Sequence, residues 1–202
     1  MTFTVGLTGG IGSGKTAVSS RLGGLGADIV DTDEISRALT AAGGAAMDAV
    51  RGAFGERYVR ADGSLDRAAM RALAFEDPLA RARLEAILHP AIRAQAQRAL
   101  AARRGPYAVL VVPLLFETRG YRDRVDRTLV VDCPEALQVE RAARRSGLAP
   151  EEVRRVIDAQ WPRWRRLQVA DDVVWNGGGL EALETQCRTL DSRYRAAAGA
   201  AR

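Results

Sequence analysis

An eight-residue segment near the amino terminus, GGIGSGKT, combines residue types that bind phosphate groups. Glycines allow successive backbone N–H groups to turn toward one anion, and a lysine adds a mobile positive charge. A hydroxyl directly after the lysine is suited to a magnesium ion held by the phosphates. The segment fits the pattern G-x-x-x-x-G-K-[ST], and its residues are our candidates for nucleotide binding: Gly9, Gly10, Ile11, Gly12, Ser13, Gly14, Lys15 and Thr16.

The surroundings of this segment favour phosphate binding over a glycine-rich turn that matches by accident. Residues 3–8 are a short apolar run typical of a buried strand, and the residues after Lys15 have the apolar spacing of a helix. Strand, loop and helix are the context that the motif requires. Lys15 is also the one lysine among the 30 lysine and arginine residues of the chain. A slim ammonium group can reach terminal phosphates from within the loop, whereas a planar guanidinium has the wrong shape.

Acidic residues end two further apolar runs. The segment ADIVDTD closes with Asp31 and Asp33, which would point the same way from a strand, next to the phosphate loop if the first two strands lie close together. Either carboxylate could take a proton from an attacking hydroxyl or hold magnesium through water. Alternatively, Asp33 caps the helix that follows. Asp132, at the end of TLVVDC, is either a magnesium-binding carboxylate or a structural residue.

Short apolar strands alternate with helical segments, which predicts an α/β fold with a mainly parallel sheet. Residues 34–105 are too long for one crossover and predict a helical insertion, with a helix that ends or restarts at His89–Pro90. Residues 134–169 predict two arginine-rich helices, whose arginines either neutralise a transferred phosphoryl group from a mobile lid or form a solvated face. The expected strands are residues 3–8, 27–33, 107–117, 126–133 and 170–178.

Composition narrows the function further. The 202 residues fit one globular domain with a small inserted or lid subdomain, and the net charge of +5 indicates either nucleic acid or a polyanionic small molecule as partner. Few aromatic residues and no basic run interleaved with them make nucleic acid the weaker alternative. No segment has the pattern of a signal peptide or a membrane span. The one asparagine, Asn176, lies far from Lys15, which excludes the guanine-reading N-K-x-D motif, and the one histidine excludes a histidine-cluster metal site.

Several further segments make the chain resemble the dephospho-CoA kinases. They follow the family's order and spacing: GLTGGIGSGKT, DTD with EISR, ADGSLDR, LHP, VVPLLFE, QVERAARR and ADDVVWNGG. The resemblance implies a three-layer P-loop fold with a five-stranded parallel core (1–33, 106–133 and 170–202), a helical acceptor-binding insertion (34–105) and a helical lid (134–169). It implies transfer of the γ-phosphoryl group of ATP, with Mg²⁺, to the 3′-hydroxyl of dephospho-CoA, the last step of CoA synthesis. A nucleoside or nucleotide kinase of the same class is the alternative.

The resemblance also implies roles for single residues. Asp33 would be the general base, assisted by Lys15 and Arg141, and Thr16 would hold Mg²⁺ with a water-mediated Asp31 or Asp33. Arg145 and Asn176 would contact ATP. Arg166 stands where the family often has lysine, and Trp175 where relatives are often polar. The implied acceptor contacts are Asp33, Arg37, His89, Pro113, Leu114, Leu115 and Glu117. We expect a cytoplasmic monomer or weak homo-oligomer that binds dephospho-CoA, but neither nucleic acid nor membranes.

Overall fold

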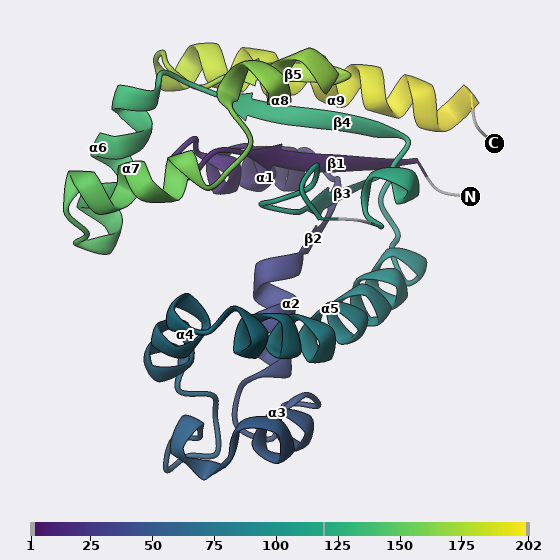
Figure 1. Ribbon diagram of the computed structural model, residues 1–202. Coiled ribbons are helices and arrows are strands. Elements are labelled where there is room, and N and C mark those ends of the chain that lie inside the picture. The colour runs from purple at the N-terminus through teal and green to yellow at the C-terminus, as the bar shows by residue number, and fades with distance from the viewer. Residues whose placement is uncertain (1–2, 119, 201–202) are drawn as a thin grey trace. The chain divides into compact units, whose positions relative to one another are not determined.

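The computed structural model describes residues 3–118 and 120–200, and these form one five-stranded parallel sheet flanked by helices (Figure 1). The sheet order is β2-β3-β1-β4-β5, so the amino-terminal strand lies at its centre. The fold class predicted from the sequence is confirmed. The strands are β1 (Thr4–Gly9), β2 (Asp28–Asp31), β3 (Ala108–Val111), β4 (Arg127–Asp132) and β5 (Asp172–Trp175).

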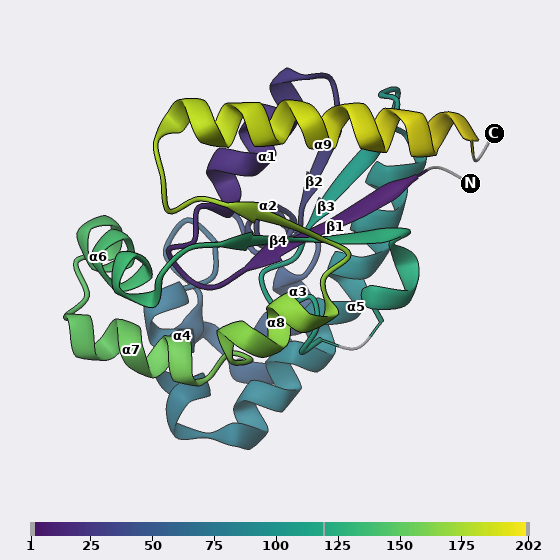
Figure 2. The same ribbon diagram turned by 90° about the horizontal axis from the view of Figure 1, so that it is seen from above.

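The chain divides into two compact units, and the first contains the sheet. It comprises the described parts of Met1–Val30 and Arg103–Arg202. Its helices are α1 (Lys15–Gly24), α6 (Glu135–Ser146), α7 (Pro150–Asp158), α8 (Arg163–Val169) and α9 (Leu180–Ala200). Helices α1 and α9 lie along the same side of the sheet (Figure 2). Their apolar faces and the central strands form one core, which includes Val5, Leu7, Val18, Leu22, Val109, Leu129, Val131, Leu183 and Tyr194.

The second unit, Asp31–Ala102, is helical, as the sequence predicts. It contains α2 (Thr32–Leu39), α3 (Met47–Phe54), α4 (Arg67–Glu76) and α5 (Pro78–Ala101). Two small clusters hold it together. One cluster is Met47, Val50, Tyr58, Leu65 and Met70, and the other is Leu39, Ala46 and Ile92. The unit therefore has apolar cores of its own, separate from the sheet.

Helix α5 differs from the prediction at Pro90. The sequence predicts that the helix ends or restarts there, but α5 is one continuous helix of 24 residues that passes through Pro90. Proline removes the hydrogen bond to the carbonyl four residues earlier, at Ala86. Strong helix formers on both sides, mostly alanine, leucine and arginine, outweigh this loss. Packing of α5 against α2 and α4 adds further support.

Two predicted strands end earlier than expected. The third was predicted to run to Glu117, but β3 stops at Val111 and a turn follows. Pro113 has no N–H group with which to continue the ladder. The second was predicted to run to Asp33, but α2 already begins at Thr32. In addition, β3 separates β2 from β1 in the sheet, so the first two strands do not lie side by side.

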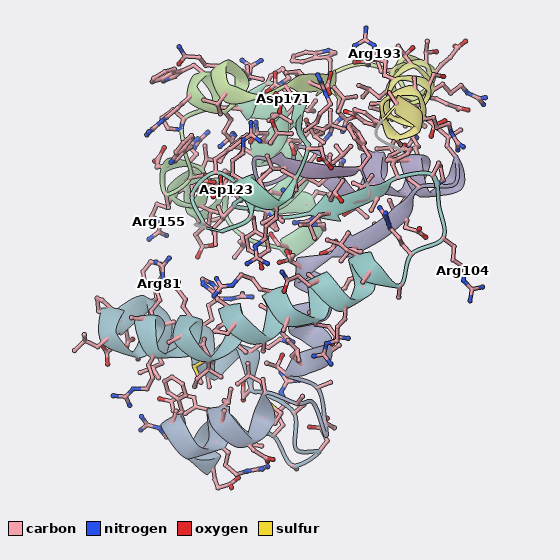
Figure 3. The ribbon with its side chains drawn as sticks, turned by 90° about the vertical axis from the view of Figure 1, so that its right-hand side faces the viewer. Arg81, Arg104, Asp123, Arg155, Asp171 and Arg193 are labelled. Atoms are coloured by element: carbon pink, nitrogen blue, oxygen red, sulfur yellow. The ribbon has the colours of Figure 1, made fainter. Side chains whose placement is uncertain are left out.

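Exposed arginines account for much of the positive charge. Arg104 and Arg155 extend into solvent, and exposed Arg193 lies 3.9 Å from the carboxylate of Asp172 (Figure 3). Others pair with an acid one helical turn away: Arg144 with Glu140, Arg154 with Glu151 and Arg188 with Glu184. Such solvated or paired side chains are the usual state of helix surfaces and need no polyanion to explain them.

Candidate functional site

The phosphate loop joins the end of β1 to the start of α1 and packs tightly against its neighbours. Gly12 and Gly14 have φ angles of 71° and 98°, which side-chain-bearing residues rarely adopt. A side chain on Gly12 would also collide with the backbone carbonyl of Gln138, and one on Gly14 with the amide of Asn176. No side chain of the described residues caps α1, so its first N–H groups face the loop. This arrangement suits a phosphate group.

Lys15 and Thr16 stand at the helix end of this loop. The Lys15 ammonium donates to the carbonyls of Gly9, at 2.8 Å, and Gly10, at 3.2 Å. These bonds hold the charge inside the curve of the loop, where terminal phosphates bind in this motif. Thr16 is exposed, so its hydroxyl is accessible. A hydroxyl there is a suitable magnesium ligand when phosphate oxygens supply others.

Asn176 ties the loop to two other parts of the first unit. Its side-chain Nδ2 donates to the carbonyl of Ser13 at 2.7 Å, and its backbone N–H donates to the carbonyl of Asp132 at 2.7 Å. Its own carbonyl accepts from Arg141 Nη1 at 2.9 Å. Asn176 is buried, so these bonds are shielded from water. The structure places Asn176 and Arg141 together at the loop, while their contacts with ATP stay predictions.

Asp132 is engaged by an arginine. Both of its carboxylate oxygens accept from Arg163, at 2.8 and 2.7 Å. This bond raises the pKa of Arg163. The guanidinium also lies 5.8 Å from the ring centre of Trp175. Because a bidentate partner already occupies the carboxylate, the structural interpretation of Asp132 is favoured over the magnesium-binding one.

The connection between α7 and α8 is tied to the phosphate loop. Gln160 Oε1 accepts from the backbone N–H of Ile11 at 3.1 Å, and Glu117 Oε1 accepts from that of Trp161 at 2.9 Å. Arg166 donates to the carbonyl of Trp161. The base of the predicted lid is therefore fixed to the loop and to the segment after β3. Glu117, predicted as part of an acceptor pocket, has this anchoring bond in the structure.

The other predicted acceptor residues of the first unit differ in exposure. Leu115 is fully buried and packs over Gly6 of β1. Its side chain is inaccessible to solvent because the turn after β3 directs it into the core, and its predicted place in the wall of the acceptor pocket stays a prediction. Leu114 is 36% exposed. The carbonyl of Pro113 accepts from the Thr8 hydroxyl at 3.0 Å. Leu114 retains the surface that a substrate contact needs.

In the second unit, Asp31 rather than Asp33 caps α2. Asp31 Oδ1 accepts from the N–H groups of Asp33, at 2.8 Å, and Glu34, at 3.3 Å. The prediction that both aspartates project from a strand end is therefore wrong, as is the alternative that Asp33 is the cap. Asp33 lies in the first turn of α2, exposed, with Arg37 one turn further along. Capping leaves Asp31 poorly suited to holding magnesium, whereas Asp33 is not required as a cap.

Arginines gather beside this face of α2. Arg67 Nη2 donates to the Thr40 hydroxyl at 2.6 Å and to the carbonyl of Arg37 at 3.4 Å. Burial, followed by the nearby charges of Arg37, Arg60 and Arg71, lowers the pKa of Arg67. Arg67 was not singled out from the sequence as a site residue, although it lies in the segment ADGSLDR. His89 is half-buried on α5.

Within the described residues, no three histidine, cysteine, aspartate or glutamate side chains group closely enough to hold a metal ion. The donors therefore fit a magnesium ion held mainly by phosphate oxygens and water, with Thr16 as the protein ligand. No helix in the described part of the chain is long and apolar enough to cross a membrane.

Comparisons with known proteins agree with one another. The family model described as dephospho-CoA kinase matches residues 3–182. The dephospho-CoA kinase of Aromatoleum aromaticum is 56% identical over 198 residues, covering 98% of this chain and 97% of the relative. The crystal structure of TT1252 from Thermus thermophilus superposes with a TM-score of 0.83 at 34% identity, covering 95% and 97% of the two chains. Shikimate kinase from Bacteroides thetaiotaomicron, at 13% identity, a TM-score of 0.51 and coverage of 96% and 98%, shares the fold. The chain belongs to the dephospho-CoA kinase family.

Proposed function

We propose that this chain transfers the γ-phosphoryl group of ATP to the 3′-hydroxyl of dephospho-CoA, forming CoA and ADP. The observation that carries the proposal is the phosphate loop, with left-handed glycines, uncapped helix N–H groups and Lys15 folded into its curve, in a chain of this family. Phosphoryl transfer needs little covalent chemistry from the protein, so positioning and charge stabilisation dominate.

The donor half of the reaction belongs to the first unit. The loop N–H groups and Lys15 hold the β- and γ-phosphates of ATP, and the Asn176 bond to Ser13 keeps the loop in shape. Thr16 would be the protein ligand of Mg²⁺. When bound, the ion neutralises charge on the phosphate oxygens. The fixed geometry of loop and lysine therefore orients the γ-phosphoryl group for in-line attack.

Most of the residues proposed for the acceptor half belong to the second unit. Asp33 accepts the proton of the attacking hydroxyl, a role open to it because Asp31 performs the capping. After burial, the charges of Arg37, Arg60 and Arg71 lower the pKa of Arg67, so these four arginines lie close enough together to fit the diphosphate of dephospho-CoA. His89, Pro113, Leu114 and Glu117 remain proposed acceptor-side residues.

The helices α6–α8 are assigned to the lid. Arg141 and Arg145 lie on α6, where Arg145 is exposed. A lid that closes over the phosphates excludes water and so limits wasteful hydrolysis of ATP. We infer that the enzyme works in the cytoplasm as a monomer or weak homo-oligomer, independently of nucleic acid and membranes. The solvated and paired arginines of its helices support this view.

The experiment that tests the proposal is a coupled ADP-release assay with ATP, Mg²⁺ and dephospho-CoA, run beside AMP, CMP and adenosine. We expect turnover with dephospho-CoA and little with the other acceptors. Faster turnover with AMP, CMP or adenosine would instead identify a nucleotide or nucleoside kinase of the same class. Omitting Mg²⁺ should abolish turnover, which tests the assigned metal separately.

A further inference from the structure

Arg166 is a buried cation next to the phosphate loop. It lies on α8 and is only 4% exposed. Its surroundings offer little compensation, because its guanidinium donates to the backbone carbonyl of Trp161 and forms no ion pair with a carboxylate of the described residues. Glu117, Asp132 and Glu135 attract it from beyond ion-pair distance, but Glu117 already accepts a bond from the N–H of Trp161, and Asp132 accepts two from Arg163. The positive charge is thus incompletely neutralised.

Such a state is costly unless an anion completes it. Arginine is almost never fully buried unless paired, since moving a charge out of water carries a large desolvation penalty. Burial lowers the pKa of Arg166, which expresses the same cost, although a guanidinium stays protonated at neutral pH. A neutral backbone carbonyl cannot offset a full charge. A bound anion would supply the missing counter-charge.

The position of Arg166 indicates which anion this is. Its Nη2 lies 3.0 Å from the point that a Cβ atom on Gly10 would occupy. The carbonyl of the same Gly10 accepts from the Lys15 ammonium at 3.2 Å. Two cations therefore approach one loop residue, Arg166 at its Cα and Lys15 at its carbonyl. In this motif the lysine marks the place of the β- and γ-phosphates.

The predicted lid arginines occupy other positions. Arg141 donates to the carbonyl of Asn176, and Arg145 is exposed on the last turn of α6. Gln138 Oε1 also faces Gly10, but it is buried with no hydrogen-bond donor among the described residues. Arg166 is therefore the buried guanidinium that the described structure holds against the loop.

We propose that Arg166 binds the γ-phosphate of ATP and stabilises it during transfer, an inference that rests on the proposed function. The bond from the γ-phosphorus to the β–γ bridging oxygen breaks, and this oxygen leaves with its electron pair as part of ADP, while the acceptor oxygen forms the new bond to phosphorus. The acceptor proton passes to Asp33. Arg166 remains protonated throughout and donates hydrogen bonds to the non-bridging oxygens, whose charge it balances.

The test compares nucleotides that differ in the γ-phosphate. Binding of AMPPNP and of ADP, each with Mg²⁺, is measured by calorimetry for wild type and for Arg166→Met. Because Arg166→Met loses a charge-assisted hydrogen bond, its affinity for AMPPNP should fall about 10- to 100-fold. The affinity for ADP should change by less than about threefold, since ADP lacks the γ-phosphate that Arg166 contacts. The matched control is Arg165→Met, which removes an exposed charge one residue away and should alter neither affinity.

Arg166→Gln guards against a folding defect, because it removes the charge but keeps a donor for the Trp161 carbonyl. The same selective loss of AMPPNP affinity in this variant supports the proposal. Equal weakening of both nucleotides, or no change in either, overturns it and leaves Arg166 as a structural residue. These measurements contain no acceptor. A wild-type protein that fails to phosphorylate dephospho-CoA would therefore refute the proposed function, while the γ-phosphate contact would still be judged by binding alone.

Discussion

The bond between Asn176 and Ser13 leads to a prediction with a defined size. Asn176→Ala removes the amide that donates to the Ser13 carbonyl at 2.7 Å and leaves this acceptor without its partner. An unsatisfied buried acceptor costs about 1–3 kcal/mol, so we expect a loss of about 2 kcal/mol in the free energy of unfolding. For a chain of this size, the melting temperature should then fall by about 4–8 °C.

The same change should also weaken phosphate binding, because the bond from Asn176 to Ser13 shapes the loop that holds the phosphates. We expect the affinities for ADP and for inorganic pyrophosphate to fall together, by about tenfold or more, since small displacements of binding groups are costly. Calorimetric titrations of both ligands would measure this. Gln186→Ala is the matched control: Gln186 bonds both to the N–H and to the carbonyl of Trp175, but in positions open to solvent.

Two outcomes would contradict the reasoning. If ADP binds more weakly but pyrophosphate does not, Asn176 contacts the adenosine part of the ligand rather than shaping the loop. If the free energy of unfolding and both affinities match those of the Gln186→Ala control, the buried bond from Asn176 to Ser13 has no measurable effect on stability or on the site.

Asp33→Asn should retain ATP binding but lower kcat with dephospho-CoA by about 10²-fold, the usual contribution of a general base; unchanged turnover would remove Asp33 from the chemistry. Lys15→Arg keeps the charge, yet its guanidinium is too broad for the space beside the Gly9 and Gly10 carbonyls, so steady-state turnover should fall, and wild-type kinetics would disprove the shape argument. Burial by itself raises the pKa of Asp171, but hydrogen bonds from the Thr128 hydroxyl and N–H outweigh it, so the pKa lies below its usual 3.8. Asp171 should therefore stabilise the fold above that pH and lose this effect as the pH falls through its folded pKa. In urea unfolding, the stability difference between wild type and Asp171→Asn should shrink from pH 6 toward about pH 3, and a difference independent of pH would refute this assignment.

Local patterns predicted those parts of the molecule that local physics determines. The phosphate loop was predicted from eight consecutive residues because its glycines, lysine and hydroxyl act within one turn of chain. The parallel sheet followed from apolar strands alternating with helices. The end of β2 was misjudged because the cap is decided by which carboxylate meets the N–H groups, and that carboxylate belongs to Asp31.

Such local patterns do not predict contacts between residues that lie far apart in the sequence. Gln160 bonds to Ile11 across 149 residues, and Arg163 bonds to Asp132 across 31. Neither glutamine nor arginine has a spacing there that distinguishes it from other surface residues of an arginine-rich helix. The burial of Arg166 and of Leu115 likewise depends on how α8 and the turn after β3 pack, which the sequence alone does not show.

Asp28 joins the chain segment just before the helical unit to the segment just after it. Its carboxylate accepts from the N–H groups of Arg104, at 2.8 Å, and Gly105, at 2.5 Å, while its own N–H donates to the carbonyl of Tyr107. The segment entering the second unit is thus bonded to the segment leaving it. Closing a flexible loop of roughly 70 residues costs about 4 kcal/mol in chain entropy. A helical unit that folds early, through its local contacts, shortens that loop before β2 and β3 pair, so the insertion assists assembly of the sheet that it interrupts.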